Sequence, residues 1–161
     1  LLCLGLETLD LRVQRSCSNA LAVAQYLQEK REVISVDYPL LEGSRAYENA
    51  SKQFSGGGAI VTFSLSDKTK AYHFLNTLKL IRRGTNIQDN KSLAIAPYHT
   101  IYAEYSEEQK LSYELNEGMI RLSVGIEDLE DLLEDIDQAL AHEEPVILEK
   151  EDVQGSYSFD V

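Results

Sequence analysis

The stretch from Gly118 to Asp128 constrains the fold of this chain more than any other. Within it, Ile120, Leu122 and Val124 share one face of a predicted β-strand, and the residues between them share the other face. Two acidic residues then open a strongly amphipathic helix. A strand that buries one face, followed at once by a helix with one apolar side, predicts a sheet that is covered by helices.

Arg121 stands in the middle of this strand, where a charged side chain must reach either water or a partner. Most charged strand residues are solvated, so spacing alone favours an outward-facing residue in a surface ion pair. The other interpretation is a binding site, because a planar guanidinium holds a carboxylate with two parallel hydrogen bonds. The strand pattern leaves both interpretations open.

Periodicity along the rest of the chain alternates between helix and strand. It predicts helices over residues 5–28, 44–54, 67–78 and 127–141, a short helix opened by a capping box at 106–109, and strands over 33–38, 59–65, 80–82 and 118–125. Ser66 or Asp67 can cap the third helix. Residues 83–105 are polar and interrupted, which makes them the best candidate for a functional loop. The one-sided apolar faces predict an α/β sandwich, with a mostly antiparallel sheet of four or five strands and helices on one face.

Three local patterns refine these elements. In the predicted strand over 33–38, Ile34, Val36 and Tyr38 share one face. The triplet Gly56–Gly58 follows a helix and precedes a strand, an order that favours a flexible turn over an anion site. The first helix carries apolar residues at steps of three and four, namely Leu6, Leu9, Val13, Cys17, Ala20, Ala24 and Leu27.

The composition is that of one globular domain. A chain of 161 residues, 43% of them apolar, is long enough for a real core. No apolar run approaches the roughly 20 residues that span a bilayer, and Leu1–Leu4 is too short for a signal peptide. The net charge of −12 is concentrated between Glu127 and Asp152, where 12 acidic residues accompany the single basic residue Lys150. Such a run is usually a solvated helix face plus a tail, and it argues against nucleic-acid binding.

The cysteines and histidines indicate neither a disulfide nor a metal site. If Cys3 and Cys17 both lie on the first helix, 14 residues separate them by about 21 Å, too far for a disulfide. His73, His99 and His142 are scattered without metal-ligand spacing. We therefore expect a cytoplasmic, metal-free protein without membrane or nucleic-acid partners.

Residues 118–128 read Gly-Met-Ile-Arg-Leu-Ser-Val-Gly-Ile-Glu-Asp, a run that resembles the signature near the C-terminus of the Cys/Met-metabolism enzymes dependent on pyridoxal phosphate. That family includes cystathionine synthases and lyases, methionine gamma-lyase and O-acetylhomoserine sulfhydrylase. Its motif arginine binds the α-carboxylate of the amino-acid substrate, and the resemblance implies that role for Arg121. The implied fold is that of the C-terminal domain of aspartate-aminotransferase-type enzymes.

The first helix extends the resemblance. Residues 7–15 and 19–24 resemble the helix that leads from the family's cofactor-binding domain into its C-terminal domain. The resemblance spans about residues 5–141. It implies a linker helix over 1–30, a C-terminal substrate domain over 31–142 and an acidic, weakly ordered tail over 143–161, where residues 145–148 can add an edge strand. Because the chain does not begin with methionine, we expect it to start inside a longer protein.

Residues 85–93 resemble the Ala-Asn-Val-Gly-Asp-Ala-Lys-Ser-Leu segment of sulfhydrylase-type members. In the family this segment lines the substrate pocket and helps to hold the carboxylate. The resemblance therefore implies a substrate-binding role for Asn86, whose amide can donate a hydrogen bond. Without the resemblance, Asn86 is interpreted equally well as a turn residue. Gln88 replaces a glycine of the segment, which can narrow the pocket or alter the turn.

Residues 95–102 align with the family's Ile-His-Pro-Ala-Ser-Xaa-Thr-His, with secure matches only at Ile95 and Pro97. The departures leave the substrate open and are compatible with a specialised or a degenerate member. They fall at Ala96, Tyr98, Ile101 and Tyr102.

The resemblance implies part of an enzyme. The family's Schiff-base lysine and phosphate-binding residues lie in its large domain and have no counterpart here, so we expect no catalytic and no cofactor-binding residues in this chain. The implied parent enzyme uses pyridoxal phosphate for γ-elimination or γ-replacement on homoserine esters, cystathionine or methionine. The implied partners are the amino-acid substrate, the N-terminal cofactor domain and further copies, since the family forms homotetramers.

Two other functions fit the alternation of strands and helices. One is a free-standing regulatory or binding module with a ferredoxin-like plait, in which Arg121 binds an effector carboxylate. The other is an interaction domain that uses the acidic final helix.

Overall fold

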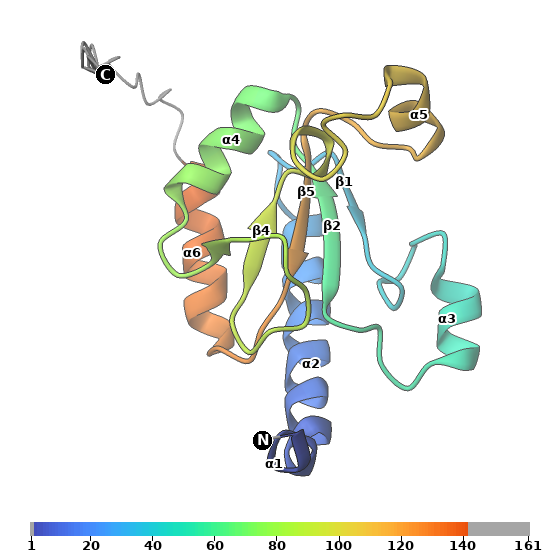
Figure 1. Ribbon diagram of the computed structural model, residues 1–161, viewed down its shortest axis with the longest axis vertical. Helices are drawn as coiled ribbons and strands as arrows, with labels where there is room; N and C mark the ends of the chain where they lie inside the picture. Colours follow the sequence, from blue (N-terminus) through green and yellow to red (C-terminus); the bar gives the residue numbers. More distant parts are fainter. Residues whose placement is uncertain (1, 142–161) are drawn as a thin grey trace, which may run out of the picture.

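The structure, a computed structural model, describes residues 2–141 (Figure 1). Five strands form one sheet: β1 (Ser35–Asp37), β2 (Ile60–Ser64), β3 (Arg82–Arg83), β4 (Leu93–Ile95) and β5 (Met119–Ser123). The helices are α1 (Leu2–Glu7), α2 (Leu9–Gln28), α3 (Tyr47–Gln53), α4 (Lys68–Thr77), α5 (Glu107–Ser112) and α6 (Leu129–Ala141), with a 3-10 turn, η1, at Pro97–His99.

The strand order is β1-β2-β5-β4-β3, with β2 and β5 near the middle. The pairs β1–β2, β2–β5 and β4–β5 are antiparallel, whereas β3 and β4 are parallel. The sheet is therefore mixed: three of its four strand pairs are antiparallel, in line with the predicted mostly antiparallel sheet of four or five strands, and the pair at one edge is parallel. The parallel pair arises because residues 84–92 carry the chain back along the sheet before β4 begins.

The core lies between one face of this sheet and helices α2, α4 and α6. Val61 and Phe63 of β2 and Ile120 and Leu122 of β5 alternate with less apolar positions, and all four are buried. The Phe63 ring meets the edge of Phe74 from α4 at a centroid distance of 5.4 Å. Burial of each large apolar side chain contributes about 1.5–3 kcal/mol. The predicted helical cover of one face is confirmed, and the same alternation turns the intervening strand residues to the opposite face.

Two helix starts follow the predicted capping chemistry. The Asp67 carboxylate accepts a hydrogen bond from the backbone N–H of Lys70 at 3.0 Å and caps α4. At α5, Ser106 and Gln109 form the reciprocal capping box, with each side chain accepting from the other residue's backbone N–H. These local signals position α4 and the excursion that carries α5.

The first helix differs from its prediction. It is interrupted at Thr8, which separates α1 from α2, and the first part of its apolar stripe is exposed at Leu6, Leu9 and Val13. Only the later part of the stripe, such as Ala20 and Leu27, is buried. The physical reason is visible in Figure 1, where α1 and the first turns of α2 project beyond the end of the sheet.

Two other predictions need correction. Ile34 does not share a buried face with Tyr38: it is 68% exposed, because the edge strand β1 begins after it. Residues 83–105 are not one loop, since they contain β4 and η1. A three-residue strand is too short to show an alternating pattern. The predicted tail over 143–161, with its edge strand, lies outside the described residues.

The glycine triplet is shaped around an aromatic ring. A Cβ on Gly57 would lie 2.5 Å from the Tyr38 ring, and Gly58 has a φ of +82°. The Tyr38 hydroxyl lies 3.0 Å from the Gly58 carbonyl and 3.3 Å from that of Cys17. Burial raises the pKa of Tyr38 to about 12. These contacts favour the turn interpretation over an anion site.

Candidate functional site

Arg121 lies at the centre of β5, on the sheet face opposite the helices. Its register partners are Thr62 on β2 and Ile95 on β4. Ile120 and Leu122 on either side of it are buried in the core, so alternation directs Arg121 away from the helices. The predicted orientation of this arginine is confirmed.

The Arg121 guanidinium is half-buried and only partly used. Its Nη2 donates to the Thr85 carbonyl at 2.8 Å, while its Nε is buried without a hydrogen-bond acceptor among the described residues. Burial lowers the pKa of the guanidinium, and Tyr102 nearby acts in the opposite direction. No ion pair of Arg121 is found between residues 2 and 141. This cation thus retains donor capacity for an acceptor from elsewhere.

The loop over residues 84–92 is tied to β5 on this same face. Arg121 holds the Thr85 carbonyl, and the Ser123 hydroxyl oxygen accepts from the backbone N–H of Gln88 at 2.7 Å. Asn86 lies between these two anchors and is exposed. The fold therefore places the loop that carries Asn86 beside the strand that carries Arg121, although the two residues are 35 positions apart in the sequence.

Gln88 adopts a φ of +56°, in the left-handed region that favours glycine. The resemblance implies a glycine at this position, and a glycine adopts this conformation without strain. The backbone N–H of Gln88 donates to the Ser123 hydroxyl oxygen, which holds the turn in this conformation.

A buried polar network supports the base of this loop. The Glu127 carboxylate accepts from the Ser92 N–H at 2.6 Å and from the Ser92 hydroxyl at 2.9 Å. The Ser92 oxygen accepts from the Gly125 N–H at 2.8 Å, and the Asn19 amide donates to the carbonyls of Gly125 and Glu127. The sequence motifs did not predict that four residues hold the loop in place: Asn19, Ser92, Ser123 and Glu127. The feature that could have indicated these roles is that all four residues lie in the segments that resemble the family, namely residues 19–24, 85–93 and 118–128.

Gly125 completes the network through its lack of a side chain. A Cβ at this position would lie 2.4 Å from the Asn90 carbonyl oxygen. That carbonyl accepts from the Ile126 N–H at 3.0 Å, so the backbone of the loop packs directly on the end of β5. The second glycine of the 118–125 strand is therefore required by close packing.

The residues after β4 that depart from the family pattern lie in different environments. Tyr98 donates to the Glu107 carboxylate, which also accepts from Lys110 Nζ at 3.0 Å, and that ammonium lies 4.3 Å from the Tyr98 ring centroid. The hydrogen bond to Glu107 raises the pKa of Tyr98 to about 12. Tyr98 thus fastens η1 to α5. Ala96 is buried, Ile101 is exposed and Tyr102 is half-buried.

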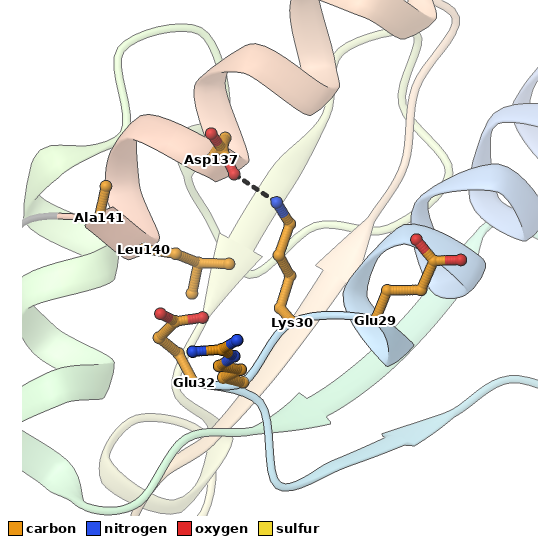
Figure 2. Close-up of a pocket in the computed structure, with 7 residues that line it drawn as sticks. Glu29, Lys30, Glu32, Asp137, Leu140 and Ala141 are labelled. Atoms are coloured by element: carbon orange, nitrogen blue, oxygen red, sulfur yellow. Dashed lines mark hydrogen bonds and ion pairs between the residues drawn. The ribbon is translucent and has the colours of Figure 1, made fainter.

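A surface pocket on the helical side lies apart from this site. Figure 2 shows it at the C-terminal ends of α2 and α6, where Lys30 Nζ lies 2.5 Å from an Asp137 oxygen. Its other lining residues are Glu29, Arg31, Glu32, Leu140 and Ala141. Neither Arg121 nor Asn86 lines it, and its charges are of both signs.

Three of the lysine amines in the described part of the chain already have carboxylate partners. These are the amines of Lys30, Lys52 and Lys110, and the glycine triplet is closed around Tyr38. Between residues 2 and 141 there is also no group of three or more His, Cys, Asp or Glu residues that could hold a metal ion. In the same part of the chain, no helix is long and apolar enough to cross a membrane.

Curated proteins with similar sequences act in sulfur amino-acid metabolism. L-Methionine gamma-lyase of Pseudomonas putida is 38% identical over 141 residues, and O-succinylhomoserine sulfhydrylase of Mycobacterium tuberculosis is 39% identical over 142 residues. The alignments cover 87% and 85% of this chain, respectively. The chain spans only 35% of the length of each of these relatives.

Solved structures with the same fold carry related names. A structure of O-acetylhomoserine sulfhydrylase from Wolinella succinogenes has a TM-score of 0.76 and 49% identity, over 85% of this chain and 36% of that chain. A putative O-acetylhomoserine (thiol)-lyase from Campylobacter jejuni has a TM-score of 0.82 and 31% identity, over 84% of this chain and 33% of that chain. The latter contains N'-pyridoxyl-lysine-5'-monophosphate.

The family described as Cys/Met metabolism PLP-dependent enzyme matches residues 1–141. This match covers most of the chain and includes both the loop over 84–92 and the arginine strand. The chain therefore belongs to the pyridoxal-phosphate-dependent enzymes of cysteine and methionine metabolism.

Proposed function

We propose that this chain is the C-terminal, substrate-binding domain of a pyridoxal-phosphate-dependent enzyme, and that Arg121 binds the α-carboxylate of its amino-acid substrate. One observation carries the proposal. Arg121 is a half-buried cation on the open side of the sheet, without a carboxylate partner among the described residues. The bond from Nη2 to the Thr85 carbonyl leaves the positive charge of this partly buried guanidinium without a negative partner among the described residues, and a partly buried charge is stabilised by such a partner. A substrate carboxylate supplies such a partner.

The proposed reaction is γ-elimination or γ-replacement on a homoserine ester, cystathionine or methionine. The names of the relatives support this class, since they include a methionine gamma-lyase and several homoserine-ester sulfhydrylases. In such enzymes the cofactor acts as the electron sink. The role of this chain is to orient the substrate by fixing its carboxylate.

Asn86 is proposed as a second polar group at the carboxylate. The loop that carries it is held by Arg121 on one side and by Ser123 on the other. An exposed amide on a fixed loop can donate to a carboxylate oxygen that the arginine also binds, because each carboxylate oxygen accepts more than one hydrogen bond. Preorganisation of the loop lowers the entropy lost on binding.

The other proposed partners are inferred from the length of the chain relative to its relatives and from its exposed apolar side chains. The chain spans 35% of its relatives, which supports an N-terminal cofactor domain elsewhere in the same protein. The exposed leucines of α1 and α2 favour further contacts, either with that domain or with other copies. Family membership favours this assignment over a free-standing regulatory module or an interaction domain.

The proposal is tested by substitution of Arg121 in the longer enzyme. Loss of a charge-assisted pair costs about 2–5 kcal/mol, so Arg121→Ala should lower kcat/KM by about 30-fold to several thousand-fold. Most of that change should appear in KM, with the absorbance of the bound cofactor unchanged. Arg121→Lys should recover only part of the loss, because an ammonium does not form the planar fork.

Arg82→Ala is the matched control, because Arg82 is an exposed arginine on β3 of the same sheet. It should leave kcat/KM within about twofold of the wild type. Unchanged kinetics in Arg121→Ala, combined with a lower melting temperature, would show instead that Arg121 is only a structural residue.

A further inference from the structure

The turn over residues 85–88 is anchored to β5 at both of its ends. At one end, the Thr85 carbonyl accepts from Arg121 Nη2 at 2.8 Å. At the other end, the backbone N–H of Gln88 donates to the Ser123 hydroxyl oxygen at 2.7 Å. Arg121 and Ser123 are two positions apart on one strand, so they share a face and their Cα atoms lie about 7 Å apart. The turn therefore runs beside the stretch of strand that leads from Arg121 to Ser123.

Gln88 is held in a strained conformation that serves no visible purpose in the fold. Its φ of +56° lies in the left-handed region, which a glycine adopts freely and a residue with a Cβ does not. The side chain is exposed, and no hydrogen bond of its amide is found among the described residues. Neither packing nor hydrogen bonding of the side chain offsets the strain there. Strain of this kind indicates a function for the side chain.

The position of Gln88 relative to the arginine suggests what that function is. Its backbone N–H faces the strand while its side chain is exposed, so the side chain lies on the outer side of the turn, from which a ligand reaches Arg121. In an amino acid extended from its carboxylate, the atom on the γ-carbon lies about 5 Å from the carboxylate carbon. A ligand that extends along β5 towards Ser123 therefore brings its γ-substituent to Gln88. In the other direction, η1 packs against the strand.

We propose that Gln88 is a specificity-determining residue of the Arg121 site, and that its side chain limits the size of the group carried on the γ-carbon of the substrate. This inference rests on the proposed function and deepens it by naming the substrate class. The class is a homoserine ester with a short acyl group, such as acetyl. A succinyl group is longer by a methylene and a carboxylate, and it meets the Gln88 side chain.

The inference is tested by the preference of the longer enzyme between two esters. We compare kcat/KM for O-succinyl-L-homoserine and O-acetyl-L-homoserine in the presence of sulfide. The wild type should prefer the acetyl ester. Gln88→Gly removes the side chain and keeps the turn, so the ratio of succinyl to acetyl kcat/KM should rise by about tenfold. A purely structural residue would not produce a selective gain for one substrate.

Three further variants separate the possible causes of such a gain. Gln88→Ala removes most of the side-chain volume without the backbone freedom of glycine, and it should raise the ratio in the same direction. Asn90→Gly is the matched control, because it adds backbone freedom at an exposed position of the same loop and should leave the ratio within about twofold of the wild type. Arg121→Ala should lower kcat/KM for both esters by a similar factor and leave the ratio unchanged.

The remaining outcomes distinguish the inference from the proposed function. The inference alone is wrong if neither Gln88 variant raises the ratio, if the wild type prefers the succinyl ester, or if it acts on L-methionine and on neither ester. A gain in Gln88→Gly or Asn90→Gly without one in Gln88→Ala would assign the effect to backbone freedom and exclude the side chain. Unchanged kcat/KM for both esters in Arg121→Ala, or no turnover of either ester or of L-methionine by the wild type, would overturn both.

Discussion

The Nη2 atom of Arg121 donates a hydrogen bond to the carbonyl oxygen of Thr85 at 2.8 Å, across 36 positions of sequence. The proposed ligand-binding cation is therefore also an anchor of the loop that carries Asn86. Removal of the arginine should affect the loop even when no substrate is present.

We expect Arg121→Ala to increase hydrogen exchange of backbone amides in residues 84–90. Loss of the bond to Thr85 releases one end of this segment, whereas Gln88 stays bound to Ser123. Exchange measured by mass spectrometry should show the increase, with α6 unchanged. Arg82→Ala is the control and should leave the loop protected; equal protection in all three proteins would contradict the anchoring role.

Gln88→Gly should raise the free energy of unfolding by about 1 kcal/mol, because a left-handed conformation is costly for residues with a Cβ. Gln88→Ala keeps the Cβ and the positive φ, so it should show little or none of this gain. Urea denaturation of the three proteins measures the difference. The interpretation of strain at Gln88 is wrong if alanine stabilises as much as glycine.

Ser92→Ala should destabilise the chain by about 1–3 kcal/mol. Ser92 is 2% exposed, and its hydroxyl both donates to Glu127 and accepts from the Gly125 N–H. Alanine leaves those two buried groups without their partner. Ser55→Ala, at an exposed position, is the control and should change stability by less than about 0.5 kcal/mol. Equal denaturation midpoints would show that the network contributes nothing.

Stability should fall as the pH rises from about 10 to about 12, in part through Tyr38. The folded state raises the pKa of Tyr38 from 10.0 to about 12, because burial disfavours the phenolate. In this window the unfolded chain releases its proton first, so unfolding is favoured by rising pH. This contribution is fully present below pH 10.

Tyr38→Phe should therefore make the decline of stability with pH shallower in that window. Tyr98, whose pKa is also raised to about 12, remains in the variant and contributes a residual slope. Denaturation at a series of alkaline pH values measures the effect, and Tyr47→Phe is the control. Parallel curves for wild type and Tyr38→Phe would exclude the buried phenol as a cause.

The parts of the fold that the sequence predicts are those with strong local patterns. The alternation in β2 and β5 and the apolar stripe of α6 are local, and each was found where predicted. β4 was not predicted, because Leu93–Ala94–Ile95 is short and its pairing with Arg121 is decided across 26 positions of sequence. The break at Thr8 and the exposure of Leu6 likewise depend on where the sheet ends.

In the candidate site, too, some features were predictable from the sequence and others were not. Arg121 and Asn86 were identified from side-chain identity within recognisable motifs, and their substrate-binding roles remain predictions. The contacts that bring them to one face use the Thr85 carbonyl and the Gln88 N–H, which every residue other than proline supplies. No residue pattern marks such bonds, so the loop position required a structure.

The most direct test of the central claim is a crystal structure of the longer enzyme with an unreactive amino-acid substrate analogue bound. We predict that both carboxylate oxygens lie within hydrogen-bond distance of the Arg121 guanidinium, with the bond from Nη2 to Thr85 retained. A carboxylate held elsewhere, with Arg121 paired to an acidic side chain from another part of the protein, would contradict the account.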